Sequence, residues 1–450
     1  MSSTDAPTTE RVVIVGGGFA GVACAQGLAE HGVEVTLIDR NTYHQFQPLL
    51  YQVATAQLAP SDIMRPLRGL FRKHPSVAVK EAEVTAVDPV ARTVRTAEGE
   101  TFTGDVLVLA TGARATFFGV AGAEEHAFPL YTARDAERLR NRVLQLFEDA
   151  DLEPARLDRG ALTFVVVGGG PTGVETAGAL ADLVNDVMPE RYHDLDVHRA
   201  RIVLVDHGDT VLRPFSSKAH DYAAEVLAHK GVRLELGTSV EEVTPEKVVL
   251  GDGSEIATRC VVWAGGLSVP PLDGTDDVAR GRGGRIDAGQ DLSVPGFPGV
   301  YAIGDVAGVE GPDGRPYPQL GSVAMQGGRA AATSILATRA GVAAPAFRYH
   351  DKGIMAMIGK GAAVAEIGAH HHELHGTIAY SAWLGVHAWL MNTTRARVDA
   401  FISWAWDSFS RSRSPAIIDA PDQPRIDWGD EDQTDDAAAA DDARPEGAQP

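Results

Sequence analysis

The stretch from Arg11 to Asp39 limits the possible folds of this chain more than any other feature. It opens with the short β-branched run Arg11–Val15, which is typical of a buried parallel strand. Glycines follow in the spacing G-x-G-x-x-G, which permits a tight turn, a close approach to a pyrophosphate and close helix–strand packing, at Gly16, Gly18 and Gly21. Asp39 ends the next strand, where a carboxylate can accept a hydrogen bond from a ribose 2′-hydroxyl. The segment predicts a Rossmann-like dinucleotide-binding unit, with a structural βαβ unit lacking a ligand as the alternative.

A second copy of this pattern begins about 150 residues later. Ala161–Gly173 reads ALTFVVVGGGPTG and carries its glycines at Gly168, Gly170 and Gly173. The strand Arg201–Asp206 again ends in an acid, although the connection to it is lengthened by residues 185–199. Asp206 is followed by a histidine and not by an arginine that could accept a 2′-phosphate, which favours NADH over NADPH. Two such units predict two dinucleotide sites in one chain.

Further segments fit the same nucleotide-binding architecture. Residues 104–112 form an apolar run that ends in Ala-Thr-Gly and is expected to be a return strand of the first unit. Residues 300–308 form a strand that stops at Asp305, which either caps the turn or accepts a hydrogen bond from a cofactor. Short antiparallel strands are expected over 77–94, and helices over 133–152 and 320–337. Residues 40–66 are expected to form a loop and short helix, either beside the cofactor or as a plain surface connection.

The composition is that of a globular protein of two or three domains, with 450 residues, 44% apolar and 22% charged. A formal net charge of −21 argues against a nucleic-acid partner, although residues from Pro421 onward contribute ten acids against two arginines. The two cysteines, Cys24 and Cys260, are expected to be small core residues and not a disulfide or metal pair. The N-terminal residues show no secretory signal, and a reducing compartment is the default expectation. No apolar run reaches 18 residues, so no membrane-spanning helix is expected.

The segment 378–413 combines four tryptophans with four arginines. Val398, Phe401, Ile402, Ala405 and Phe409 recur at helical spacing, which predicts an amphipathic helix able to lie in a bilayer interface. Asn392, Thr393, Thr394 and Asp399 make the segment polar enough for a peripheral, salt-sensitive attachment. The same face could form a dimer interface or cover the protein's own core. The histidines at 370–372 and 375 lack a cysteine or a spaced acid pair and are expected to form an exposed loop, so no metal site is expected.

In combination these motifs resemble the two-dinucleotide flavoprotein superfamily and, within it, the type II NADH dehydrogenases, which are single-chain NADH:quinone oxidoreductases. The segments that carry the resemblance are YHQFQPLLYQVATAQLAPSDIMR at 43–65, GGGPTGVETAGAL at 168–180 and YHDKGIMAMIG at 349–359. The likeness spans about residues 10–418 and implies an α/β fold with two Rossmann-like domains and a C-terminal amphipathic helical segment. The implied domains are the first part of an FAD domain at 10–118, an NADH domain at 119–285, the second FAD part at 286–340, a flavin-covering and membrane- or dimer-contacting segment at 341–418, and an acidic disordered tail at 419–450.

The resemblance also implies roles for individual residues. Those expected to bind FAD or line the flavin are Gly16, Gly18, Gly21, Asp39, Arg40, Gln52, Thr111, Gly112, Asp305 and Lys352. Those expected to bind NADH are Gly168, Gly170, Gly173, Asp206 and Gly265. Glu175 falls where the family has its quinone-side carboxylate, and Gln326 is the last glutamine of its A-Q-x-A-x-Q quinone motif. Ser322 replaces the first glutamine of that motif, which puts the identity of the quinone in question. Glu175, Lys352 and Gln326 are the expected catalytic residues.

The resemblance implies an enzyme that passes hydride from NADH to FAD and then two electrons to a membrane quinone without pumping protons. Such a protein would be cytoplasmic and peripherally attached to the inner face of the cytoplasmic membrane, and it could be a homodimer. Two other functions stay open: a soluble FAD-dependent NAD(P)H oxidoreductase with a protein or diffusible acceptor, and a slow redox sensor. Disulfide reductase and sulfide:quinone chemistry is not expected, because both need redox cysteines near the flavin and this chain has two isolated ones.

Overall fold

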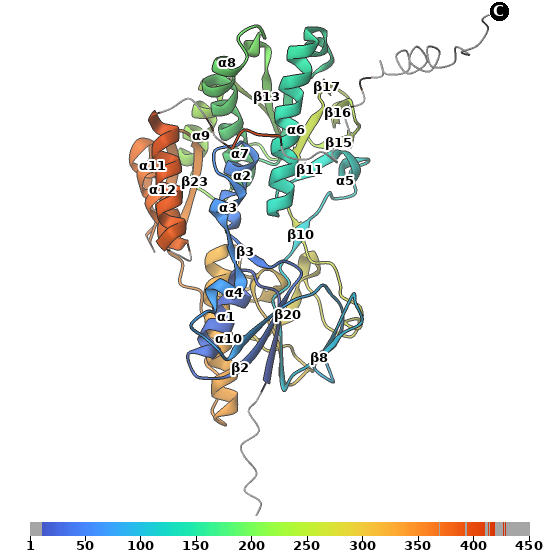
Figure 1. Ribbon diagram of the computed structural model, residues 1–450, viewed down its shortest axis with the longest axis vertical. Helices are drawn as coiled ribbons and strands as arrows, with labels where there is room; N and C mark the ends of the chain where they lie inside the picture. The colour runs from blue at the N-terminus through green and yellow to red at the C-terminus, as the bar shows by residue number, and fades with distance from the viewer. Residues whose placement is uncertain are drawn as a thin grey trace, which may run out of the picture. The chain divides into compact units, whose positions relative to one another are not determined.

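The computed structural model describes residues 11–368, 370–391, 394–409, 413, 415–418, 426 and 428 (Figure 1). The chain divides after Ile417 into two compact units, and every helix and strand described below belongs to the first. Asn392, Thr393, Arg411, the side chain of Phe409 and almost all of the predicted acidic tail lie outside the described residues.

The first sheet is parallel and has the strand order β21-β9-β1-β2-β5. Its strands are β1 (Arg11–Val15), β2 (Glu34–Asp39), β5 (Val77–Glu81), β9 (Val106–Leu109) and β21 (Val300–Ala302). The carboxyl ends of parallel strands share one edge, so Gly16, Asp39, Thr111 and Asp305 are brought to the same side although they are far apart in sequence. The prediction of antiparallel strands over 77–94 is wrong for β5, because residues 77–81 extend this parallel sheet beside β2.

The second sheet is also parallel and repeats this plan in the order β11-β18-β12-β13-β14. Its strands are β11 (Ala127–Pro129), β12 (Thr163–Val167), β13 (Arg201–Asp206), β14 (Val232–Leu236) and β18 (Cys260–Trp263). The central β12 is buried along its whole length, which explains its continuous run of β-branched and aromatic residues. The two parallel sheets with their helices confirm the α/β prediction with two Rossmann-like units.

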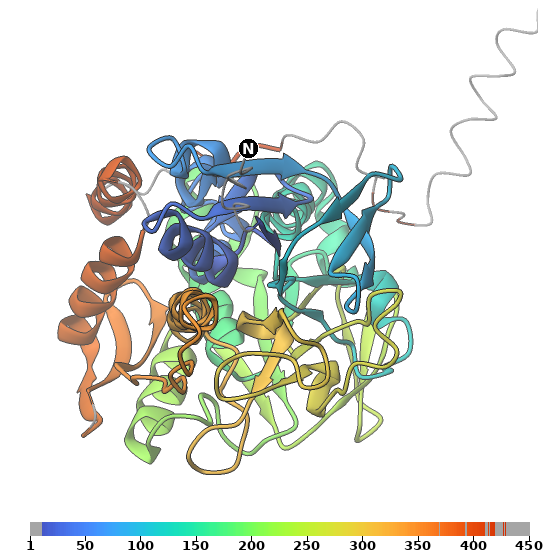
Figure 2. The ribbon, with the colours of Figure 1, turned by 90° about the horizontal axis from the view of Figure 1, so that it is seen from below.

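Each sheet contains a strand that is followed by a glycine turn and a helix. The helices are α1 (Phe19–Ala29) in the first unit and α7 (Pro171–Asp182) in the second. Helix α10 (Gly321–Arg339) packs along α1, and Figure 2 shows it end-on beside α1. The alanines and glycines of both helices allow this close packing. Helix α6 spans Ala133–Leu152 as predicted, and Thr132 and Asp135 cap its start with reciprocal hydrogen bonds.

The remaining elements connect or flank these two units. Short helices are α2 (Leu50–Ala54), α3 (Pro60–Ile63), α4 (Leu67–Leu70), α5 (Ala123–His126) and α8 (Met188–Arg191), and the longer α9 spans Ser217–His229. Small sheets are formed by β3 (Tyr43–Gln45) with β4 (Met64–Pro66), by β6 (Val84–Asp88) with β7 (Thr93–Thr96) and β8 (Thr101–Thr103), by β10 (Arg114–Ala115) with β19 (Leu267–Ser268), by β15 (Val240–Val243) with β16 (Lys247–Leu250) and β17 (Glu255–Ala257), and by β20 (Ile286–Ala288) with β22 (Ala307–Val309). The loop and short helix predicted over 40–66 therefore contain two helices and a strand pair.

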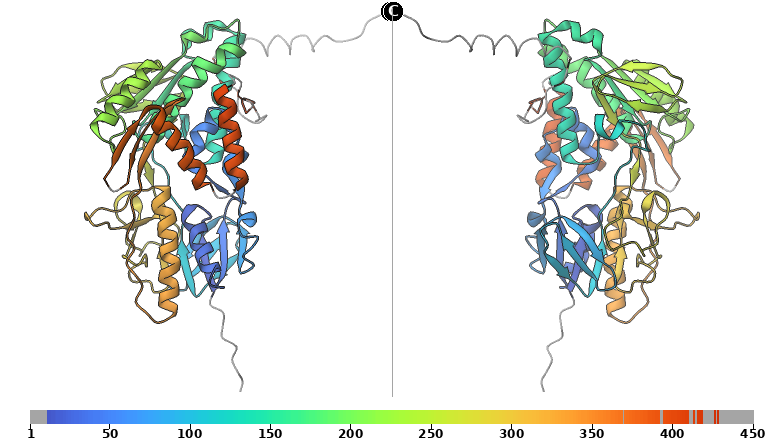
Figure 3. Two further views of the ribbon diagram at one scale, coloured as in Figure 1. Left: turned by 90° about the vertical axis from the view of Figure 1, so that its left-hand side faces the viewer. Right: turned by 90° about the vertical axis from the view of Figure 1, so that its right-hand side faces the viewer.

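The segment after residue 350 forms an antiparallel sheet followed by two helices. The strands are β23 (Gly353–Gly359), β24 (Ala362–Ile367) and β25 (His372–His375), and the helices are α11 (Gly376–Leu390) and α12 (Thr394–Phe409), which Figure 3 shows side by side. Two helices replace the one amphipathic helix that the sequence predicts. The predicted histidine loop is wrong in part, because His372 and His375 lie in β25, although both are exposed as expected.

Candidate active site

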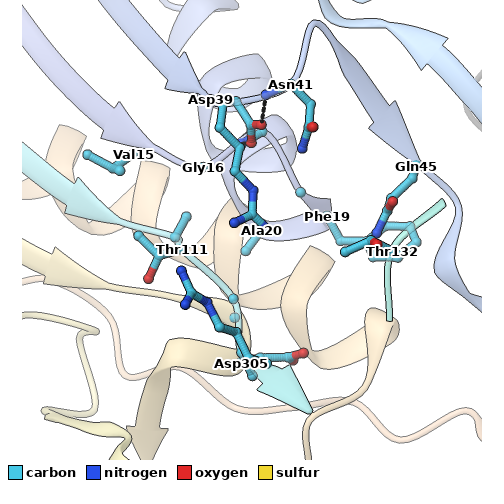
Figure 4. Close-up of a pocket in the computed structure, with 18 of the residues that line it drawn as sticks. Val15, Gly16, Phe19, Ala20, Asp39, Asn41, Gln45, Thr111, Thr132 and Asp305 are labelled. Atoms are coloured by element: carbon cyan, nitrogen blue, oxygen red, sulfur yellow. Dashed lines mark hydrogen bonds between the residues drawn. The ribbon is translucent and has the colours of Figure 1, made fainter. Parts of the chain in front are cut away.

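A pocket lies at the carboxyl edge of the first sheet, where the glycine turn, the strand ends and the start of α10 meet (Figure 4). The predicted residues that line it are Gly16, Gly18, Asp39, Arg40, Thr111, Gly112 and Asp305. Gly21 lies one turn into α1, where it supports the turn and does not line the pocket. The structure thus brings together predicted residues from four separate parts of the chain.

The three glycines of the first turn do different work. Gly16 has φ +109°, and a Cβ there would lie 2.2 Å from the carbonyl oxygen of Ala110. A Cβ on Gly21 would lie 1.8 Å from the carbonyl oxygen of Gly16, so these two positions are closed to any side chain. A Cβ on Gly18 would meet nothing within 4 Å. Gly16 and Gly21 therefore build the turn, and Gly18 leaves space in front of the helix N-terminus for a ligand.

Asp39 closes the glycine turn. One carboxylate oxygen accepts the N–H of Gly17 at 2.6 Å, and the other accepts the N–H of Asn41 at 2.7 Å, the bond drawn in Figure 4. Because a carboxylate offers about four lone-pair directions, both oxygens can still accept a hydrogen bond from a ribose hydroxyl. Asp39 is thus oriented before any ligand arrives.

Asp305 lies at the opposite side of the pocket and has a partner that sequence reasoning missed. The hydroxyl of Tyr131 donates to its carboxylate at 3.1 Å and accepts the N–H of Ala113 at 3.2 Å. Burial raises the pKa of Asp305, while Tyr131 and the positive charge of Arg285 oppose the rise. Tyr131 follows β11, outside every motif, so no spacing in the sequence could have indicated it.

The second glycine turn repeats the geometry of the first. Gly168 has φ +112°, a Cβ on Gly173 would lie 1.8 Å from the carbonyl oxygen of Gly168, and a Cβ on Gly170 would meet nothing within 4 Å. Asp206 accepts the N–H of Gly169 at 2.5 Å and that of Gly208 at 2.7 Å. Gly265 lies against the ring of Trp263, the residue that ends β18. The same construction twice in one chain points to two nucleotides.

Gln52 and Lys352 lie outside the residues that line the pocket. Gln52 is fully buried in α2, where its amide donates to the hydroxyl of Tyr51 at 3.1 Å and accepts the indole N–H of Trp404 at 2.8 Å. It therefore connects α2 to the C-terminal helix α12. Lys352 is exposed just before β23.

The side-chain amide of Gln326 forms two hydrogen bonds with the backbone of one residue. It donates to the carbonyl oxygen of His350 at 3.0 Å and accepts the N–H of His350 at 2.9 Å. One turn earlier on α10, the hydroxyl of Ser322 lies 2.9 Å from that of Tyr349. The two motif positions of α10 thus hold the chain that leads into Lys352.

Glu175 faces β23 from the second turn of α7. Its carboxylate accepts the N–H of Met357 at 3.2 Å, on the edge of β23 that β24 does not pair. Burial raises its pKa to about 8, and the N–H of Met357 and the nearby indole of Trp383 oppose the rise. A carboxyl group with that pKa holds its proton at neutral pH and can give it up, which suits a general acid.

The two cysteines are both buried, and they lie in different units of the fold, Cys24 in α1 and Cys260 in β18. Burial raises the pKa of both thiols to about 12, so neither is a thiolate at neutral pH. Among the described residues no group of three or more His, Cys, Asp or Glu side chains could hold a metal ion.

Two parallel sheets, each with a glycine turn and an acid at the end of its second strand, define the class of proteins that bind two dinucleotides. The family described as pyridine nucleotide-disulphide oxidoreductase matches residues 10–328. The chain belongs to this family and, within it, to the type II NADH:quinone oxidoreductases.

Individual relatives support this assignment. The chain is 36% identical to the type II NADH:quinone oxidoreductase Ndh of Mycobacterium tuberculosis, over 92% of this chain and 91% of that protein. It is 27% identical to the type II NADH:quinone oxidoreductase of Staphylococcus aureus, over 78% of this chain and 88% of that protein. The fold matches that of NDH2 from Plasmodium falciparum in complex with NADH, with a TM-score of 0.84 and 19% identity over 91% of this chain and all of that one.

Proposed function

We propose that this protein is an FAD-dependent enzyme that oxidises NADH and reduces a membrane quinone. The observation that carries the proposal is the pair of matching glycine turns, one of which opens onto a pocket lined by Asp39 and Asp305. The relatives named NADH:quinone oxidoreductases, which match over nine-tenths of the chain, support quinone as the acceptor.

The first pocket fits FAD. The open space at Gly18 and the uncapped N-terminus of the 11-residue α1 suit a pyrophosphate, because the free N–H groups there attract negative charge. Asp39 and Arg40 would hold the adenosine end, and Thr111, Gly112 and Asp305 line the opposite side. Bound there, FAD would supply the hydride and electron chemistry that connects NADH to the quinone.

NADH belongs to the second turn in this proposal. Gly170 leaves space for its pyrophosphate, and Asp206 can accept hydrogen bonds from the hydroxyls of an unphosphorylated ribose. Gly265 lies at the end of β18, on the same edge of the sheet. In this proposal the FAD domain comprises residues 10–118 and 286–340, and the NADH domain comprises residues 119–285. Residues 341–418 form the C-terminal segment.

Glu175 supplies a proton to the quinone. The overall reaction, NADH + quinone + H⁺ → NAD⁺ + quinol, takes up one proton beyond the hydrogen carried by NADH. The carboxylic acid of Glu175 gives that proton to a quinone oxygen, is left as a carboxylate and regains a proton from water. Lys352 would steady negative charge at the flavin, and Gln326 would position the Lys352 segment through His350.

The helices α11 and α12 would attach the protein to the inner face of the cytoplasmic membrane. Ile378 and Trp389 on α11 are 71% and 73% exposed, and Ile402 and Trp406 on α12 are 63% and 62% exposed. Large apolar side chains gathered on neighbouring helices are typical of an interfacial membrane contact. Among the described residues, no helix is long and apolar enough to cross a bilayer. Arg413 departs from the expected flanking role, because it is buried and donates to the carbonyl oxygen of Thr55.

Stopped-flow spectroscopy of the purified yellow protein tests the proposal. We expect NADH to bleach the flavin absorbance faster than NADPH does, and menaquinone or ubiquinone analogues to restore it. Failure of every quinone to restore the absorbance would refute quinone reduction. Restoration by a soluble protein carrier alone would instead favour a soluble oxidoreductase.

A further inference from the structure

Two buried polar hydrogens close to Glu175 lack good acceptors. The hydroxyl of Tyr51, a residue 2% exposed, donates to the thioether sulfur of Met357 at 3.2 Å, and a thioether is a weak acceptor. The indole nitrogen of Trp383, a residue 0% exposed, has no partner at hydrogen-bond geometry among the described residues, although it lies near enough to Glu175 to lower the pKa of that carboxyl. A buried donor without an acceptor is destabilising, so its retention calls for an explanation.

Both donors lie close to the carboxyl of Glu175, since its charge raises the pKa of Tyr51 and the Trp383 indole lowers the pKa of Glu175 itself. The backbone N–H of Met357 donates to Glu175, while the sulfur of the same residue accepts the hydroxyl of Tyr51. The ring of Trp383 lies 6.3 Å from that of Tyr51, edge to face. Helix α2, strand β23 and helix α11 therefore surround one carboxyl group with three donors, of which the Met357 N–H bonds to it.

We infer that the Tyr51 hydroxyl and the Trp383 indole N–H are positioning groups that become hydrogen-bond donors to Glu175 when it loses its proton to the quinone. The inference rests on the proposed function, because it assumes that Glu175 is the proton donor. The carboxylic acid releases one proton to a quinone oxygen, and the carboxylate left behind gains bonds from the two hydrogens. Bonds to an ionised acceptor are about twice as strong as neutral ones, so these donors favour the carboxylate far more than the acid.

The other ionisable groups near Glu175 are not proposed as the proton donor to the quinone. Asp182, two turns along α7, pairs with Lys230 at 2.5 Å and accepts the backbone N–H of Lys360, and Arg413 adds positive charge beside it. His387 on α11 stacks on Trp383 at 3.9 Å, and burial lowers its pKa to about 4, so it is neutral near pH 7. Tyr380 on α11 contributes to raising the pKa of Tyr51. Glu175 is the carboxyl of this cluster without a cationic partner among the described residues.

Single variants that remove one hydrogen test the inference. Trp383→Phe and Tyr51→Phe each delete a donor, so the pKa of Glu175 should rise by about one unit in each, a tenfold change in proton affinity. The pKa is read from an infrared titration of the holoenzyme, using the carboxylic acid band that is absent in Glu175→Gln. The alkaline limb of quinone reduction should move by the same amount, while the rate of flavin reduction by NADH stays unchanged.

A third variant predicts the opposite shift. Met357→Leu keeps the side-chain volume and removes the sulfur that accepts the Tyr51 hydroxyl, while the backbone N–H remains. The released hydroxyl should turn to Glu175 and lower its pKa. Because this variant preserves packing, it also tests the inference if Trp383→Phe disturbs folding.

Matched controls separate donor loss from general perturbation. Trp389→Phe makes the same substitution on the same helix at an exposed position, and Tyr222→Phe removes a hydroxyl on α9. Both should leave the pKa of Glu175 where it is. An unchanged pKa in all three test variants would overturn the inference. Failure of quinone to reoxidise the wild-type flavin, with the infrared shifts present, would instead refute the proposed function.

Discussion

Glu175 is a carboxyl group whose chemistry is set by its surroundings. With a pKa raised to about 8 by burial, it carries its proton at pH 7 and loses it as the pH rises through that value. Its burial also affects folding: between pH 4.5 and 8 the unfolded chain releases a proton that the folded chain retains, so this group makes stability fall as the pH rises across that window.

The first prediction concerns replacement of this acid. Glu175→Gln should slow the reoxidation of the flavin by quinone about 10²-fold or more, because an amide has no proton to give. The flavin reduction by NADH should stay intact, and the loss of wild-type rate above about pH 8 should vanish. Stopped-flow measurements of the two half-reactions from pH 6 to 10 test both parts. Equal losses in the two half-reactions would count against the assignment, and Glu373→Gln, an exposed carboxyl on β25, serves as the control.

Asp206 is the residue that we propose selects NADH over NADPH. Asp206→Ala should raise the KM for NADH about tenfold, the equivalent of one hydrogen bond to a charged group. The KM for NADPH should change less, because the carboxylate repels a 2′-phosphate. Part of any loss comes from the N–H groups of Gly169 and Gly208, which lose their acceptor. Asp206→Asn keeps an oxygen acceptor, so recovery of the fold without recovery of NADH preference would separate the two effects.

At the scale of elements, each strand–turn–helix unit contains two glycines that the turn itself needs and one that leaves space for a ligand. The two kinds are distinguished by what an added methyl group would touch. On Gly21 it would overlap the carbonyl oxygen of Gly16, whereas on Gly18 it would project into open space.

This contrast gives a paired prediction. Gly21→Ala should destabilise the fold by about 1–3 kcal/mol through overpacking of the turn, which thermal unfolding of the flavin-free protein would detect. Gly18→Ala should leave that unfolding temperature unchanged and weaken FAD binding, as measured by fluorescence titration. Equal effects of the two substitutions on the flavin-free protein would contradict the assignment. Gly173→Ala and Gly170→Ala should behave the same way towards NADH.

The C-terminal helices also work as elements, because each divides its tryptophans between two environments. Trp383 and Trp404 are buried and join α11 and α12 to α2, whereas Trp389 and Trp406 are exposed. The buried pair ties the helices to the neighbourhood of Glu175, and the exposed pair is available to a membrane.

At the scale of the whole molecule, the exposed apolar side chains of α11 and α12 should decide where the protein resides. Trp389→Ser and Trp406→Ser should each lower the partition onto anionic phospholipid vesicles about tenfold, and added salt should weaken binding further. Co-sedimentation with vesicles measures the effect. Val90→Ser, at an apolar residue 74% exposed on another surface, should change nothing.

The same variants also distinguish a membrane contact from a dimer interface. Unchanged vesicle binding, with a dimer in analytical ultracentrifugation that both serine variants dissociate, would assign the face to a homodimer. Thr394 on α12 is exposed, whereas Asp399 is half-buried and lies 3.6 Å from the guanidinium of Arg65.

Local features of the chain could be predicted from the sequence. The strand Arg11–Val15, the helix Ala133–Leu152 and both glycine turns follow from short-range periodicity and spacing, and the structure has them at the predicted residues. The parallel pairing of β5 with β2 was missed, because alternating strands of similar composition fit either direction until the sheet assigns a neighbour.

What the sequence by itself determined is the pair of glycine turns and their strand-end acids, because each depends on residues close in the chain. Tertiary structure alone decided that Tyr131 meets Asp305, that Trp404 meets Gln52 and that Gln326 holds His350. It also decided that Tyr51, Met357 and Trp383 surround Glu175. These contacts join residues far apart in sequence, and the environment that raises the pKa of Glu175 exists only after four separate elements have packed together.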